Sequence, residues 1–372
     1  MLTKKTCLVL GAGASAESGL PSGRDLIYLI SKEAAAARDQ PGSLYFHAFD
    51  RITSGRLSNT RLRDSLDLFS ALLERSYSSS IDEFIVTNQT PYFKEIAKLG
   101  IAIVLNRFES SKNLFELEDY KIGRNETKST IQVPRKNWYQ QIWNRINSGC
   151  NNLDQLKTSL SNIKIITFNY DRSLEQFLYS CALNTYVRIN SDAFGFPTNN
   201  ESDIETVFRH YLQVNHVYGQ IGRLSWQNEV LGGQIPYGLN FFELKTDQIR
   251  AAIEISESIS TLQEIKDHSD AQNQLDWVSI SKDFTDASSI HFLGFGYHPQ
   301  NMRFFSNEFL NCSFSNEYSP RIGGTCMGIS KPRQSEIKFA ISNWAHGQID
   351  LPDLDLLNFV ECDISDYFNT YF

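Results

Sequence analysis

The chain has 372 residues, which is enough for one large domain with an insertion or for two domains. Apolar residues make up 41% of it and charged residues 21%, an ordinary balance for a globular protein that excludes a largely disordered chain. The net charge is −8 and the sequence pI is near 5.5, which argues against a surface built to grip nucleic acid, so we predict no direct nucleic-acid binding.

The first predicted element is a buried strand over residues 6–10, which leads into the small-residue turn "GAGASAESGLPSG". A helix is predicted from about Ser22, because Leu26 and Ile30 fall on one apolar stripe. A strand, a tight turn and a helix in this order are typical of the first unit of a doubly wound sheet.

Helical patterns dominate residues 39–159, and no segment there has a convincing strand pattern. We therefore predict a large helical insertion over this range. Within it, the polar run "EDYKIGRNETKSTIQVPRKN" mixes charges with a proline, which predicts a mobile loop.

Strands return after residue 160, and most are followed by a helical pattern. This alternation predicts a mostly parallel sheet with helices on both faces. The predicted fold class is α/β, with a doubly wound, Rossmann-like sheet formed by residues 1–38 and 160–372. The predicted strands lie in "NIKIITFNYD", "YLQVNHVYG", "SSIHFLGFGYH", "GGTCMGIS" and "LLNFVECDI", and the helices in "RSLEQFLYSCAL", "PQNMRFFSNEFL" and "KPRQSEIKFAISNWA".

No apolar run reaches the ~18 residues of a membrane-spanning helix, and the opening "MLTKKT" lacks the pattern of a signal peptide. We therefore expect a cytoplasmic protein with no membrane association. The six cysteines include no C-x-x-C pair, which excludes a structural zinc site of the paired type and makes a disulfide framework unexpected. No metal is predicted.

Ligands of open parallel sheets bind outside the carboxyl ends of the strands, so the residues that follow each strand are the candidates for a site. Small residues after the first strand would let the backbone approach a phosphate, and the following helix would add its positive end. Their spacing fits neither the usual dinucleotide fingerprint nor a P-loop, and a plain turn without a ligand is the alternative. These residues are Gly11, Ala12, Gly13, Ala14 and Ser15.

Three polar residues, Thr167, Asn169 and Asp171, follow the second strand. One of them could cap the next helix, but together they offer more hydrogen-bonding capacity than a cap needs. His216 in "VNHVYG" also follows a strand and is either a general base or a hydrogen-bonded structural residue.

The segment "FLGFGYHPQN" contains a second glycine turn at Gly294 and Gly296, which would admit a sugar or phosphate or would simply join a strand to a helix. His210 and His298 are weaker candidates than His216, because His210 falls in a strand region and His298 in a turn that leads into a helix.

Taken in order, "GAGAS", "TFNYD", "HVYG" and "GFGY" resemble the sirtuin superfamily. Within it, the chain is most similar to the zinc-less NAD-hydrolase domains of bacterial anti-phage defence systems. The likeness covers residues 4–23, 163–178, 212–222 and 290–301, and touches "SIDEFI" at 80–85.

This resemblance implies NAD as the substrate. The turn at residues 11–15 and the end of the following helix would neutralise the pyrophosphate, and Gly294 and Gly296 would admit the adenosine half. Thr167 would also belong to the residues that bind NAD. Asn169 would hold the nicotinamide-side ribose and the attacking water. Asp171 would orient Asn169 or the loop, and His216 would accept a proton from a ribose hydroxyl or from that water.

The chain also departs from the deacetylases of this superfamily. It has Pro21-Ser22-Gly23-Arg24 where they carry Pro-Asp-Phe-Arg, and it lacks their four zinc cysteines. In addition, two residues separate His216 from Gly219, which are usually adjacent in the family. The missing features belong to acyl-peptide chemistry, so the resemblance favours hydrolysis over deacylation.

The predicted function is a regulated NAD glycohydrolase that produces nicotinamide and ADP-ribose and depletes NAD in an abortive infection response to phage. The alternative is an NAD- or ADP-ribose-binding sensor or assembly subunit without turnover, and a protein deacylase or ADP-ribosyltransferase is less favoured. Control would come from a homo-oligomer or from a separate ring-forming translocase-type (HerA-like) ATPase, since this chain has no P-loop. The helical insertion is the expected assembly surface.

Overall fold

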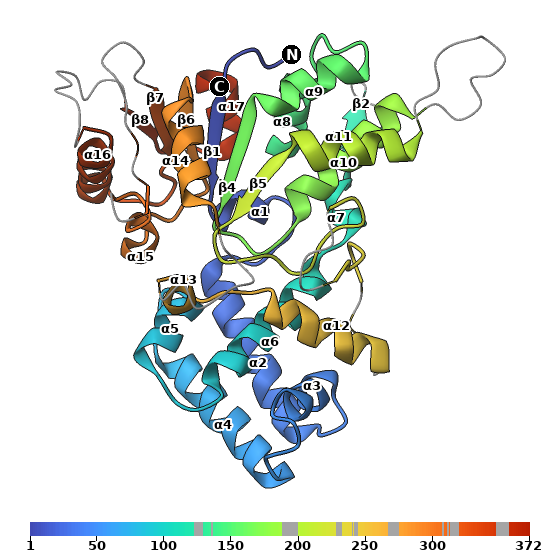
Figure 1. The fold of residues 1–372 in the computed structure, drawn as a ribbon, viewed down its shortest axis with the longest axis vertical. Helices are drawn as coiled ribbons and strands as arrows, with labels where there is room; N and C mark the ends of the chain where they lie inside the picture. The colour runs from blue at the N-terminus through green and yellow to red at the C-terminus, as the bar shows by residue number, and fades with distance from the viewer. Residues whose placement is uncertain are drawn as a thin grey trace.

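Six parallel strands form the central sheet, in the order β5-β4-β1-β6-β7-β8 (Figure 1). The computed structural model describes residues 1–122, 129–134, 137–187, 200–227, 233–239, 241, 245–266, 275–306, 309–310, 312, 320–346 and 357–372. The predicted α/β class with a doubly wound, parallel, Rossmann-like sheet is confirmed. Its strands are β1 (Thr6–Leu10), β4 (Ile163–Thr167), β5 (Gln213–His216), β6 (Ser289–Leu293), β7 (Arg321–Thr325) and β8 (Leu357–Val360).

The chain changes direction across the sheet between β1 and β6. From β1 it moves outward to β4 and β5, then returns to β6 on the other side of β1 and continues to β7 and β8. Leu10 at the end of β1 is in register with Thr167 and with Leu293, so the ends of β1, β4 and β6 lie at one level. This is the topological switch point at which doubly wound folds bind their ligands.

Helices cover both faces of this sheet. β1 is buried along its whole length, with Cys7 and Val9 in the core of one face and Leu8 and Leu10 in the core of the other. A strand buried on both faces explains the unbroken apolar run in its sequence. One face packs against α14 (Trp277–Thr285) and α16 (Lys331–His346), the other against α8 (Trp138–Asn147), α9 (Leu153–Ser161), α10 (Ser173–Tyr186), α11 (Glu201–Tyr211) and α17 (Ile364–Tyr371).

A second group of helices gathers beyond the carboxyl ends of the strands (Figure 1). We call this group the helical lobe. In it α2 packs on α4 and α6, and α12 packs on α6 and α3. Its members are α2 (Gly23–Asp39), α3 (Leu44–Ile52), α4 (Asn59–Arg75), α5 (Ile81–Thr87), α6 (Phe93–Phe108), α12 (Thr246–Glu257) and α13 (Leu262–Lys266).

The lobe therefore takes α2 and α12 from outside residues 39–159, whereas α8 and α9 from inside that range pack beside the sheet. The division of the chain into two domains at these boundaries stays a prediction. No helix among the described residues combines the length and apolar character needed to cross a membrane.

Two sequence predictions were wrong in detail. Residues 39–159 do contain strands, because β2 (Leu117–Ile122) and β3 (Ser129–Pro134) pair antiparallel within the run predicted to be a mobile loop; residues 123–128 lie outside the described part. Pairing between the two strands forms them where the local sequence mixes charged and apolar residues without a clear alternation. The helix predicted over 299–310 spans only Pro299–Met302 as α15, and Phe304 and Phe305 after it are buried against Phe168.

Candidate functional site

A cavity of about 470 Å³ lies at the switch point, between the sheet and the helical lobe. The turns after β1, β4 and β6 form one side of it, and the starts of α2 and α5 form the other. Most of the residues predicted from sequence line this one cavity, although they come from distant parts of the chain. They are Gly11, Ala12, Gly13, Ser15, Asn169, Asp171, Gly294 and Gly296.

Asn169 links the turns after β1 and β4. Its Nδ2 donates to the main-chain oxygen of Gly11 at 2.9 Å and to Ser15 Oγ at 3.0 Å. Its other side-chain atom, Oδ1, is buried and has no hydrogen-bond partner among the described residues. A buried acceptor without a partner costs free energy and is unusual in a folded protein. The amide is thus fixed through its nitrogen, and its oxygen is the unpartnered acceptor of a residue that lines the cavity.

Asp171 completes this network from the same turn. Ser15 Oγ donates to its Oδ2 at 2.7 Å, and the Ser173 N–H donates to its Oδ1 at 3.1 Å. Asp171 therefore helps to cap α10 and also holds Ser15 against Asn169. Burial raises the pKa of the Asp171 carboxyl above its usual range.

Ala14 and Thr167 do not line the cavity. Ala14 is buried, and its main-chain oxygen accepts a hydrogen bond from Trp138 Nε1 at 2.7 Å. Thr167 Oγ1 accepts from the Asn169 N–H at 3.1 Å. Both residues shape the turns that carry the lining residues.

His216 also lies outside the cavity lining. Its Nδ1 donates to the main-chain oxygen of Asn169 at 2.9 Å, and its Nε2 pairs with Glu175 Oε1 at 2.7 Å. Both ring nitrogens are engaged by protein groups, and neither is left to take a proton from a ligand. This geometry is that of a structural residue. The residue directly before Gly219 is Tyr218, which does line the cavity and donates to Asn301 Oδ1 at 2.7 Å.

The glycine turns after β1 and β6 pack directly on each other. The Gly11 N–H donates to Leu293 O at 3.1 Å, and the Gly13 N–H donates to Gly294 O at 3.0 Å. Gly294 has a φ of +55°, and a Cβ there would lie 2.2 Å from the Ala14 nitrogen. Contact between the two backbones is therefore sufficient reason for glycine at these positions.

Two other groups in the turns remain open to the cavity. The Ala12 N–H has no hydrogen-bond partner among the described residues. A Cβ on Gly296 would meet nothing within 4 Å. These are the places where a ligand can approach the backbone.

Asp82 is a cavity residue to which the sequence analysis assigned no role. It comes from α5 in the helical lobe, is 6% exposed, and accepts a hydrogen bond from the Tyr170 hydroxyl at 3.2 Å. Burial raises its pKa to about 6. A buried carboxyl with a raised pKa in a cavity is typical of catalytic sites. The segment "SIDEFI" was the available signal, but nothing local placed it beside Tyr170.

His298, a weaker candidate by sequence, also lines the cavity. Its Nε2 hydrogen-bonds with the Ser79 hydroxyl, which donates to Glu83 Oε2 at 2.7 Å. Burial lowers the pKa of His298, and the Glu83 carboxylate only partly offsets this. The imidazole is thus biased toward its neutral form.

The first turn of α2 supplies positive charge to the cavity. Arg24 is exposed and lines it, two residues after the N-cap residue Ser22, whose hydroxyl accepts from the Asp25 N–H. The helix that follows the β1 turn directly, α1 (Gly13–Ala16), is a single turn. The positive end of a long helix at this cavity therefore belongs to α2, which has 17 residues.

No group of three or more metal-ligating side chains occurs in the described part of the chain. No family model and no curated protein matches the chain. The likeness to the sirtuin superfamily stays a prediction, and function is inferred from the fold and this cavity.

Proposed function

We propose that the cavity binds NAD and cleaves its nicotinamide–ribose bond, releasing nicotinamide and ADP-ribose. The observation that carries this proposal is the buried, unpartnered Oδ1 of Asn169 at the wall of a cavity at the switch point of a Rossmann-like sheet. The order of the four sequence segments that resemble the sirtuin superfamily supports it.

The cavity wall suits a dinucleotide. The Ala12 N–H, the Arg24 guanidinium and the first turn of α2 would bind the pyrophosphate, because each offers positive charge or a free donor. The open side of Gly296 would admit the adenosine half. Asn169 Oδ1 would accept a hydrogen bond from a hydroxyl of the nicotinamide-side ribose.

Cleavage of this bond builds positive charge on the ribose, as in glycoside hydrolysis, and nicotinamide leaves as a neutral molecule. The Asp82 carboxylate would stabilise that charge and accept a proton from the attacking water. Asp171 would act through Ser15 by holding the Asn169 amide. His216 would act through the Asn169 backbone, as a positioning residue.

One observation favours the second candidate, an NAD- or ADP-ribose-binding sensor or assembly subunit without turnover. His216 has both ring nitrogens engaged, and Tyr218 stands directly before Gly219, where the resemblance implies a histidine. A cavity that retains its binding groups but lacks that base would hold NAD without cleaving it.

We propose that the helical lobe mediates assembly, either as a homo-oligomer or with a ring-forming ATPase, and that NAD depletion would serve anti-phage defence. The lobe exposes large apolar side chains that an interface would cover: Tyr28 on α2 and Leu68 and Leu72 on α4 are 57%, 47% and 38% exposed.

The test is to incubate the purified chain with NAD and to measure both bound NAD and released nicotinamide. Wild type should release nicotinamide, Asn169→Ala should lose this by about 100-fold or more, and the exposed control Asn59→Ala should match wild type. Binding of NAD without release of nicotinamide would favour the second candidate, an NAD-binding sensor or assembly subunit. Neither binding nor release, alone or with a co-purifying chain, would exclude both.

A further inference from the structure

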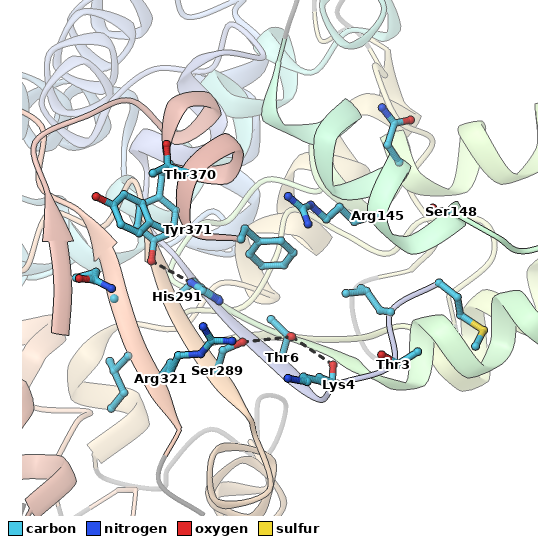
Figure 2. Close-up of a pocket in the computed structure, with 18 residues that line it drawn as sticks. Thr3, Lys4, Thr6, Arg145, Ser148, Ser289, His291, Arg321, Thr370 and Tyr371 are labelled. Carbon is cyan, nitrogen blue, oxygen red and sulfur yellow. Dashed lines mark hydrogen bonds between the residues drawn. The ribbon is translucent and has the colours of Figure 1, made fainter. Parts of the chain in front are cut away.

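A second cavity lies at the opposite end of the sheet, at the amino ends of β1, β6 and β7 (Figure 2). Its volume is about 630 Å³, and α8 and α17 form its other walls. The five-residue strand β6 separates the two cavities by roughly 17 Å. The function proposed above gives this second cavity no role.

The second cavity is positively charged in a chain that carries a net charge of −8. Lys4 before β1, Arg145 on α8 and Arg321 at the start of β7 all line it, whereas no Asp or Glu side chain does. None of these three cations forms an ion pair with another described residue. Such a concentration of one sign of charge in a hollow attracts anions.

Arg145 is held in place without being neutralised. Its Nη2 donates to the main-chain oxygen of Phe368 at 3.3 Å, and its guanidinium lies 5.5 Å from the centre of the Phe372 ring. The remaining N–H groups of the guanidinium can still bind a ligand. Figure 2 shows that Arg145 and Arg321 come from separate elements.

The buried wall of the cavity is polar and neutral. His291 Nδ1 hydrogen-bonds with the Tyr367 hydroxyl at 3.0 Å (Figure 2), and burial lowers the pKa of this imidazole to about 4. Tyr367 reaches His291 across Gly323, where a Cβ would lie 2.6 Å from the hydroxyl. The pair therefore offers hydrogen bonds without adding charge to that of the cations.

We propose that this cavity binds a nucleoside phosphate. Guanidinium groups suit the geometry of phosphate oxygens, and two of them with a lysine match a multiply charged phosphate group. The volume falls in the range of small-molecule sites. The exposed ring of Tyr371, which also lines the cavity, gives a base a surface to stack on.

The test is calorimetric titration with AMP, inorganic phosphate and adenosine as separate probes. AMP should bind wild type more tightly than phosphate or adenosine does. Arg321→Gln and Arg145→Gln should each weaken AMP binding about tenfold or more. Arg321 is exposed, so its variant should keep the melting temperature of wild type. The control Arg56→Gln, which removes an exposed cation outside both cavities, should bind AMP as wild type does.

Three results would overturn this proposal: AMP binding that neither arginine variant weakens, AMP binding that Asn169→Ala abolishes, and phosphate binding as tight as that of AMP. None of these measurements uses NAD cleavage. These experiments can therefore disprove the nucleoside phosphate site without affecting the proposed NAD hydrolysis, and the NAD assay can disprove the hydrolysis without affecting this site.

Discussion

The His216 imidazole donates from Nδ1 to the main-chain oxygen of Asn169 at 2.9 Å, across the boundary between β5 and the turn after β4. Glu175 engages the other ring nitrogen at 2.7 Å. His216 therefore positions the backbone of Asn169 through a hydrogen bond, and Asn169 in turn lines the cavity.

His216→Ala should slow nicotinamide release by about 10- to 100-fold, because a displaced Asn169 holds the ribose less well. The apparent pKa of the rate of nicotinamide release should stay the same, because Asp82 and not His216 accepts the proton from the attacking water. The rate measured against pH for both proteins tests this. Loss of the pH dependence together with nearly all activity would make His216 the base instead.

Asp82→Asn should remove the pH dependence that His216→Ala preserves. Burial raises the pKa of Asp82 to about 6, so its carboxylate is present above that pH and protonated below it. Wild-type release should therefore rise from about pH 5 to pH 7, and the variant should be slower by about 100-fold with a flat profile. The exposed Asp64→Asn is the control. An unchanged acidic limb in Asp82→Asn would contradict the role given to Asp82.

The two glycines of the β6 turn should respond differently to alanine. Gly294→Ala forces a Cβ to within 2.2 Å of the Ala14 nitrogen at a φ of +55°, and should lower the free energy of unfolding by more than about 3 kcal/mol. Gly296→Ala meets nothing within 4 Å and should change it by less than about 1 kcal/mol. Urea unfolding measures both. Equal losses would mean that the turns do not pack as described.

The Arg172–Glu109 ion pair joins the end of α6 to the start of α10. Both side chains are fully buried, Arg172 Nε donates to Glu109 Oε1 at 3.0 Å, and Nη1 donates to Ile235 O at 2.7 Å. Arg172→Met leaves the Glu109 charge buried alone and should cost about 3–5 kcal/mol of unfolding free energy. The double variant with Glu109→Leu should recover part of that loss. A double variant as unstable as Arg172→Met would show that the unpaired, buried charge of Glu109 is not the cause of the loss.

Much of the fold and part of the site follow from neighbours along the chain. The strand at residues 6–10 is an apolar run, and α2 begins where Ser22 and Asp25, three residues apart, cap each other. The order of strands and helices then places the strand ends at one edge, which is why Asn169 and Gly296 could be assigned to a single cavity in advance.

Contacts between residues distant in sequence set the rest. Asp82 belongs to the cavity only because α5 packs against Tyr170, which lies 88 residues later in the chain. His216 turns away from the cavity because Glu175 stands beside it on α10, 41 residues earlier. Local pattern specifies which residues form an element and which face is apolar, whereas side-chain direction depends on the partners that packing brings together.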